Sequence, residues 1–154
     1  MRHLPPNLME CHSAYVAKRA LLLPALMLTA CVPYPTYKTL APEASVLVVD
    51  SARKPIAGVE ATLVSTSYPH RVVRHRAVKE TGADGVAVFS SQREWRVETL
   101  MIHGSQEFFW NWCVRKDGYT TFATVYNGAA SFNSDLTVQL LPGPSQPCPS
   151  FGQE

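Results

Sequence analysis

The chain has 154 residues, with 14 Lys and Arg against 12 Asp and Glu. This length suits one domain with a hydrophobic core of useful size. The formal net charge is only +2, which gives no support for a nucleic-acid partner, and we expect none.

The N-terminal region contains a short apolar run that follows two basic residues. Lys18 and Arg19 precede residues 20–30 (ALLLPALMLTA), an uncharged run of eleven residues. Crossing a bilayer takes about 20 apolar residues, so this run is typical of a signal peptide rather than a membrane span. We therefore expect residues 1–30 to be a signal peptide. Met9 is an alternative start, because the segment before Lys18 is longer and more polar than such a leader needs.

The apolar run ends in Leu28-Thr29-Ala30-Cys31. This pattern, an aliphatic residue, two small residues and a cysteine, resembles the lipobox of bacterial lipoproteins. The resemblance implies diacylglyceryl transfer to Cys31, cleavage between Ala30 and Cys31, and acylation of the new amino group. The alternatives are an ordinary secretory signal and a buried apolar helix with a chance cysteine. Pro24 within the run argues against the helix.

The same resemblance indicates a location in the cell envelope. Acyl chains on Cys31 would make the membrane a permanent partner of the chain. Lipoproteins that stay in the inner membrane carry an aspartate after the cysteine, whereas Val32 stands here. The resemblance therefore implies the outer membrane, on either its periplasmic or its external face.

Cleavage before Cys31 would leave residues 31–154 as the mature chain, with eleven basic and eleven acidic residues and no net charge. Cys11 would leave with the leader and Cys31 would be lipidated, so Cys113 and Cys148 remain as one pair. We expect them to form a disulfide, which an oxidising compartment permits. Two buried free thiols are the alternative.

Downstream of the cysteine, the pattern changes from a proline-rich segment to short apolar runs. Val32 to Ala44 holds three prolines and no hydrophobic period, which predicts an extended tether over residues 31–44. From Ser45 onward, apolar runs are cut by turn residues, and no helical stripe of useful length occurs. The predicted strands are residues 45–50, 58–65, 71–79, 86–90, 95–102, 107–115, 119–126 and 136–141.

Strands and turns at this spacing indicate a β-sandwich. In their order they resemble the carboxypeptidase regulatory-like, or transthyretin-like, sandwich, an all-β, Ig-like fold of seven to eight strands, over residues 45–141. Residues 142–154 would then form a C-terminal tail tied by the disulfide. The resemblance rests on Val49-Asp50, Lys54-Pro55-Ile56 with Gly58-Val59, Thr81 to Phe89, Lys116 to Tyr119, and Leu136 to Leu140.

The predicted strand 107–115 carries most of its aromatic residues on one side. Phe108, Trp110, Trp112 and Val114 share one side of the strand, as expected where one face lies in the core. An aromatic ligand platform is the alternative and requires the same residues to be exposed. Cys113 then points away from the interior, which suits a bridge to a tail that runs back across the outer face.

A basic cluster occupies the predicted strand 71–79. Its charges point to both sides, which is typical of an edge strand protected from further pairing by charge. The alternative is contact with anionic lipid head groups or an acidic partner, beside the membrane. The cluster consists of Arg71, Arg74, His75, Arg76 and Lys79.

No residue pattern predicts catalysis, a cofactor or a metal ion. His70 and His75 are five residues apart and would point oppositely on a strand, and His103 lies far along the chain, so we expect no metal site. No nucleophile–base spacing or phosphate-binding loop occurs. Among transthyretin-like proteins, the 5-hydroxyisourate hydrolases end in Tyr-Arg-Gly-Ser, whereas this chain ends at residues 150–154 in SFGQE. Their activity is therefore not implied.

The function expected from the sequence is that of a lipid-anchored, non-catalytic binding or scaffolding module with an envelope protein as partner. One alternative is a subunit of an envelope or secretion machine, similar in fold to the transthyretin-fold lipoproteins of type VI secretion. An enzyme is the third class. It would require convergent polar side chains in a cleft, which the sequence does not predict.

Overall fold

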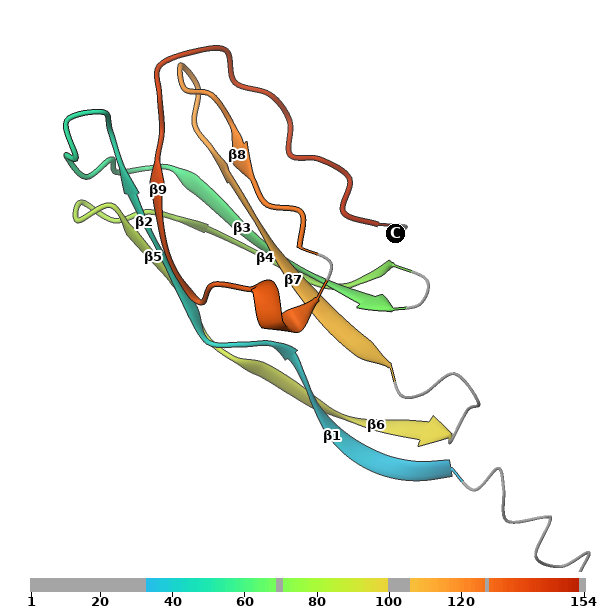
Figure 1. Ribbon diagram of the computed structural model, residues 1–154. Helices are drawn as coiled ribbons and strands as arrows, with labels where there is room; N and C mark the ends of the chain where they lie inside the picture. The colour runs from blue at the N-terminus through green and yellow to red at the C-terminus, as the bar shows by residue number, and fades with distance from the viewer. Residues whose placement is uncertain (1–32, 69–70, 100–105, 127, 153–154) are drawn as a thin grey trace, which may run out of the picture. The chain divides into compact units, whose positions relative to one another are not determined.

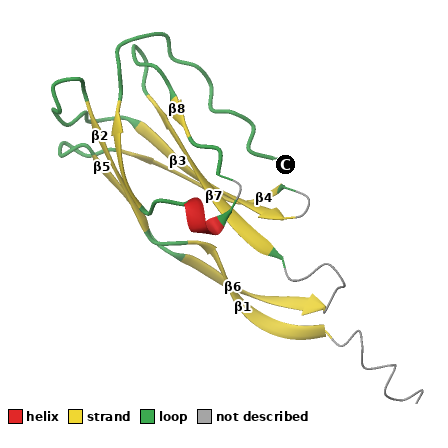
Figure 2. Cartoon of the chain, in the orientation of Figure 1, coloured by secondary structure: helices red, strands yellow, loops and turns green. Residues whose placement is uncertain are grey.

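The computed structural model describes residues 33–68, 71–99, 106–126 and 128–152. Figure 2 shows that strands and loops make up almost all of this chain, with one short 3-10 helix, η2. The all-β prediction is confirmed, although the described residues form nine strands rather than seven to eight. The elements are β1 (Pro33–Ala41), β2 (Ala44–Val49), β3 (Glu60–Tyr68), β4 (Val72–Glu80), β5 (Val86–Phe89), β6 (Gln92–Thr99), β7 (Glu107–Arg115), β8 (Phe122–Ala123), η2 (Ala129–Ser131) and β9 (Asp135–Gln139).

The strands form three sheets, in the orders β5-β2-β9, β4-β3-β7-β8 and β1-β6. The first two are the layers of a β-sandwich, and they can be followed in Figure 1. β2 pairs with β5 in antiparallel and with β9 in parallel orientation, whereas β3, β4, β7 and β8 are all antiparallel neighbours. Side chains from both layers belong to one core cluster, including Val46 and Val48 of β2, Leu63 of β3 and Trp112 of β7. Within the described residues, no helix is long and apolar enough to span a bilayer.

Alternation along β3 and β7 produces the core face of the four-stranded sheet. Leu63 lies opposite Trp112, and Ala61 lies opposite Val114; all four side chains are buried. The Trp112 ring stacks on Phe132 at a centroid distance of 5.7 Å, and its Nε1 donates to the Asn133 carbonyl oxygen at 3.0 Å. The core interpretation of the aromatic strand is therefore confirmed.

A tight turn at residues 81–85 joins β4 to β5 and requires a glycine at its end. Gly85 has a φ of +74°, and a Cβ there would lie 2.7 Å from the Val48 carbonyl oxygen. Thr81 closes the other side of the turn, since its buried Oγ1 donates to the Ile56 carbonyl oxygen at 2.7 Å and accepts from Val59 N at 3.0 Å. These bonds hold the β2–β3 connection against the β4–β5 turn.

The strand expected over residues 119–126 shortens to β8, because side chains replace part of the backbone ladder beside β7. Trp112 N donates to Thr124 Oγ1 at 2.9 Å, and Tyr126 N donates to Asn111 Oδ1 at 2.6 Å. Thr124 Oγ1 also donates to Asn111 Oδ1 at 3.1 Å. The segment after β8 therefore follows β7 through side-chain contacts rather than through continued strand pairing.

The segment expected to be a free tether, residues 31–44, instead contributes β1. β1 pairs with β6, and Leu40 and Ala41 at its end are buried. Tyr and Thr favour extended, half-buried backbone, and a strand with only one neighbour in its sheet tolerates prolines that lack an N–H group. Residues 35–96 and 106–154 make up one compact unit, which extends beyond the expected domain of residues 45–141. The described residues outside it, 33–34 and 97–99, are the outer ends of β1 and β6.

Candidate functional site

The predicted lipid attachment and cleavage residues, Ala30 and Cys31, lie outside the described residues, as do His70 and His103. Lipidation of Cys31 therefore stays a prediction from the sequence. The other predicted site residues, the disulfide pair and the basic cluster, all fall within described parts of the chain.

The structure contains the predicted disulfide between Cys113 and Cys148, with a Cα–Cα distance of 5.9 Å. Cys113 lies opposite Thr62 of β3 and so belongs to the face of the sheet that points away from the core. It is nevertheless fully buried. The bond therefore fixes a covering segment to this outer face, as the position of Cys113 on its strand predicts.

The covering segment is the C-terminal tail, residues 142–152, which runs back past β8 after β9 (Figure 1). Gly143 N donates to the Gly118 carbonyl oxygen at 3.0 Å, and Gln146 N donates to Thr121 Oγ1 at 2.9 Å. A Cβ at Gly152 would collide with the Arg71 carbonyl oxygen, so the tail comes very close to the start of β4 there. Beneath the tail, the outer-face residues Thr62, Val64, Thr66, Asn111 and Cys113 are all buried.

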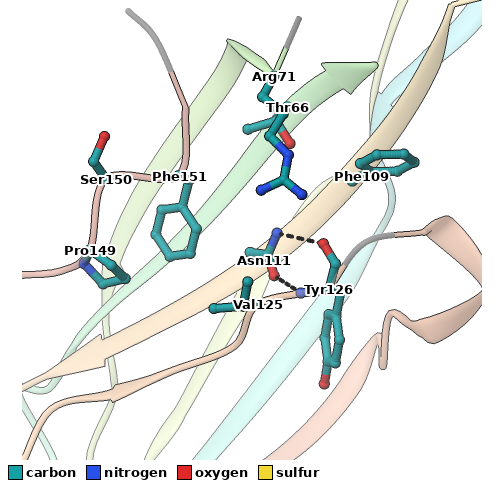
Figure 3. A pocket seen from close by; sticks show the side chains of 9 residues that line it. All are labelled: Thr66, Arg71, Phe109, Asn111, Val125, Tyr126, Pro149, Ser150 and Phe151. Carbon is teal, nitrogen blue, oxygen red and sulfur yellow. Dashed lines mark hydrogen bonds between the residues drawn. The ribbon is translucent and has the colours of Figure 1, made fainter. Parts of the chain in front are cut away.

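A small pocket of about 60 Å³ remains between the tail and the sheet. Figure 3 shows Arg71 pointing into it, with Phe151 of the tail on one side and Phe109 of β7 on the other. Asn111 beneath it is already engaged, because its amide accepts from Tyr126 N at 2.6 Å and donates to Tyr126 O at 3.4 Å. Pockets for organic ligands usually hold about 300 to 1,000 Å³. We therefore interpret this pocket as a seam under the tail rather than a substrate site.

A wider and more open depression, of about 410 Å³, lies beside the edge where β2 pairs with β9. Its lining includes Glu43, Ser45 and Asp135, and Ser45 Oγ donates to Asp135 Oδ1 at 2.9 Å. None of the residues that line it is a histidine, lysine or arginine. Among the described residues, including those of this depression, no group of three His, Cys, Asp or Glu side chains could hold a metal ion.

Four residues of the basic cluster lie on β4, an edge strand of the four-stranded sheet, and Arg71 comes directly before it. A bulge near Ser65 pairs His75 and Val73 with successive residues of β3 and leaves Arg74 between them. Arg74 Nε donates to Ser67 Oγ at 3.0 Å, and Lys79 Nζ lies 5.8 Å from the centre of the Phe89 ring in the opposite sheet, so both contacts are on the core side. Arg76 instead lies opposite Val64, on the outer side of the sheet. The charges therefore do not share one face. The position and the bulge favour protection of an edge strand, and contact with anionic lipid stays a prediction.

We expect that glutamine at all five cluster positions causes the protein to self-associate, because β4 would keep its unpaired backbone groups and lose the charges that oppose pairing. Sedimentation velocity of the wild type and the variant, in the same non-ionic detergent, measures this. The wild type should remain at one size while the variant forms larger species. A variant that stays as small as the wild type would contradict edge protection and favour the contact with anionic partners. The cluster is Arg71, Arg74, His75, Arg76 and Lys79.

Family models, curated proteins and solved structures give no match. The functional interpretation therefore depends on the residues of this chain alone.

One surface feature was not singled out in the sequence. Tyr37 of β1 and Trp95 of β6 face each other with ring centroids 5.2 Å apart, and both side chains are exposed. The prolines of residues 33–41 argued against a strand, so the sequence did not predict β1. Without that strand, the side on which Tyr37 lies could not be predicted either. Pairing with β6 then joins it to Trp95, from a part of the sequence more than 50 residues away.

Proposed function

We propose that this protein is a bacterial lipoprotein of the cell envelope, anchored by acyl chains on Cys31. The motif Leu28-Thr29-Ala30-Cys31 carries the proposal, together with the leader that precedes it. The disulfide between Cys113 and Cys148 supports it, because such bonds persist in oxidising compartments outside the cytoplasm. Several acyl chains would make the anchor effectively permanent. The residue after the cysteine, Val32, favours the outer membrane.

We further propose that the anchored sandwich acts as a non-catalytic binding or scaffolding module for an envelope protein. A non-catalytic role is supported by the buried polar side chains of the sandwich, because their hydrogen bonds stabilise strands and turns. Asn111 and Thr124 replace strand pairing, Thr81 ties two turns together, and the tail occupies the outer face of the larger sheet. A partner would therefore meet the remaining exposed surfaces, at the strand edges and the β1–β6 ribbon.

Metabolic labelling tests the anchor. Cells that express the wild type in radiolabelled palmitate should yield a labelled protein, and Cys31→Ser should abolish the label because serine has no sulfur to alkylate. Cys11→Ser is the matched control, since Cys11 lies in the expected leader. It should leave the label unchanged. An unlabelled wild type, or equal label on Cys31→Ser, would contradict the proposed function.

A further inference from the structure

The two-stranded ribbon of β1 and β6 has an unusual distribution of polar and apolar side chains. On the side toward the start of β7, Lys38 Nζ donates to the Gln106 carbonyl oxygen at 3.3 Å, and the Arg96 guanidinium lies 5.8 Å from the centre of the Phe108 ring. On the other side, Tyr37 is 54% and Trp95 71% exposed. Soluble proteins usually bury large aromatic side chains and expose charged ones. Here the two aromatic side chains are exposed, whereas Lys38 and Arg96 on the other side are half-buried.

The exposed side of the ribbon also has a consistent charge. Strand alternation places Arg93 on the same side of β6 as Trp95, and Pro35 and Thr39 on the same side of β1 as Tyr37. The two glutamates of β6, Glu94 and Glu98, alternate to the opposite side. The surface that contains Tyr37 and Trp95 therefore combines aromatic rings with a basic residue and has no acidic residue within β1 or β6.

The sequence places this surface close to the predicted lipid anchor. Tyr37 follows Cys31 by six residues, so the two cannot be more than about 20 Å apart even if the chain is fully extended. Because the compact unit begins at Pro35, only three residues of chain lie between it and Cys31, and the Cα atoms of Cys31 and Pro35 can be at most about 14 Å apart. The short chain between Cys31 and the sandwich therefore keeps the sandwich close to the membrane surface.

We propose that the Tyr37–Trp95 pair inserts into the head-group region of the bilayer that holds the Cys31 acyl chains. Tyr and Trp combine an apolar ring with a polar N–H or O–H group, and they concentrate at this level of membranes. Arg93 adds attraction to anionic head groups. The ribbon then fixes the orientation of the sandwich on the membrane, so that the partner approaches from the surfaces that remain. This proposal rests on the lipid anchor of the proposed function.

Fluorescence quenching by brominated lipids tests the insertion, with the full-length lipoprotein reconstituted into vesicles. The chain has three tryptophans, of which Trp112 is fully buried and Trp110 half-buried. The emission that the wild type shows in excess of Trp95→Phe reports Trp95. Lipids brominated near the head group should quench this component by about twofold and leave the emission of Trp95→Phe nearly unchanged.

The matched control moves the exposed tryptophan to another sheet. Val88 of β5 is 54% exposed, and the double variant Trp95→Phe, Val88→Trp should show no such quenching. Flotation of the same samples on a density gradient reports the anchor separately. Protein that floats with the vesicles but shows no quenching of Trp95, or equal quenching at position 88, overturns the insertion and leaves the anchor standing. Protein that does not float contradicts the proposed function itself, and the insertion with it.

Discussion

Replacing Cys148 by serine is expected to lower the free energy of unfolding by about 3 to 4 kcal/mol. The bond between Cys113 and Cys148 closes a loop with a sequence separation of 35 residues, and a cross-link of that length removes about this much conformational freedom from the unfolded chain. Cys148 is the better position to change, because serine at the fully buried Cys113 would also bury an unpaired hydroxyl. Urea titration of the mature lipoprotein in non-ionic detergent measures the difference.

The reductant supplies the control for this comparison. Reduced wild type should unfold at nearly the same urea concentration as Cys148→Ser, and the variant should not respond to reductant. Release of the tail should also expose Thr66 and Asn111, which line the pocket beneath it. The released tail itself should become open to proteases. Equal stability of the wild type with and without reductant would show that the tail does not depend on the disulfide.

Trp112→Ala is expected to cost about 3 to 5 kcal/mol, the usual range for removing a large aromatic side chain from a core. Trp112 is fully buried. It packs edge-on against Phe89 of the opposite sheet at 5.3 Å and stacks on Phe132. Its removal would leave a cavity between the two layers and an unpaired carbonyl at Asn133. Urea unfolding monitored by circular dichroism measures the loss without relying on tryptophan fluorescence.

Trp95→Ala is the matched control, since it removes the same side chain from the exposed ribbon. In detergent it should change the free energy of unfolding by no more than about 0.5 kcal/mol, as is usual for surface positions. Equal losses at the two positions would contradict the assignment of Trp112 to the core and Trp95 to the surface.

The sequence predicts best those strands in which apolar and polar residues alternate clearly. The strand 107–115 has the predicted ends, because large apolar residues occupy every second position from Phe108 to Val114. The same alternation directs Cys113 outward and therefore predicts a tail across the outer face. Gly85, within the stretch Thr81 to Phe89 that the resemblance rests on, has a φ of +74° at a tight turn, a conformation that glycine adopts at no steric cost.

The errors arise where side chains distant in the sequence decide the local structure. The extent of β8 depends on Asn111 and Thr124, which take over backbone hydrogen bonds, and nothing in residues 119–126 alone reveals this. The segment that forms β1 was expected to be a tether, because prolines disfavour regular strand pairing. β1 nevertheless forms by pairing with one strand, β6. The charges of β4 point to both sides, as expected, but the bulge at Arg74 is not visible in the sequence pattern.

The central claim is that the mature chain begins at a lipidated Cys31, directly ahead of the sandwich. Mass spectrometry of the protein purified from bacterial membranes tests it most directly. We expect an N-terminal peptide that starts at Cys31 and exceeds its sequence mass by a diacylglyceryl group and one further acyl chain. An N-terminal peptide without lipid, or one that begins at another residue, would contradict the account.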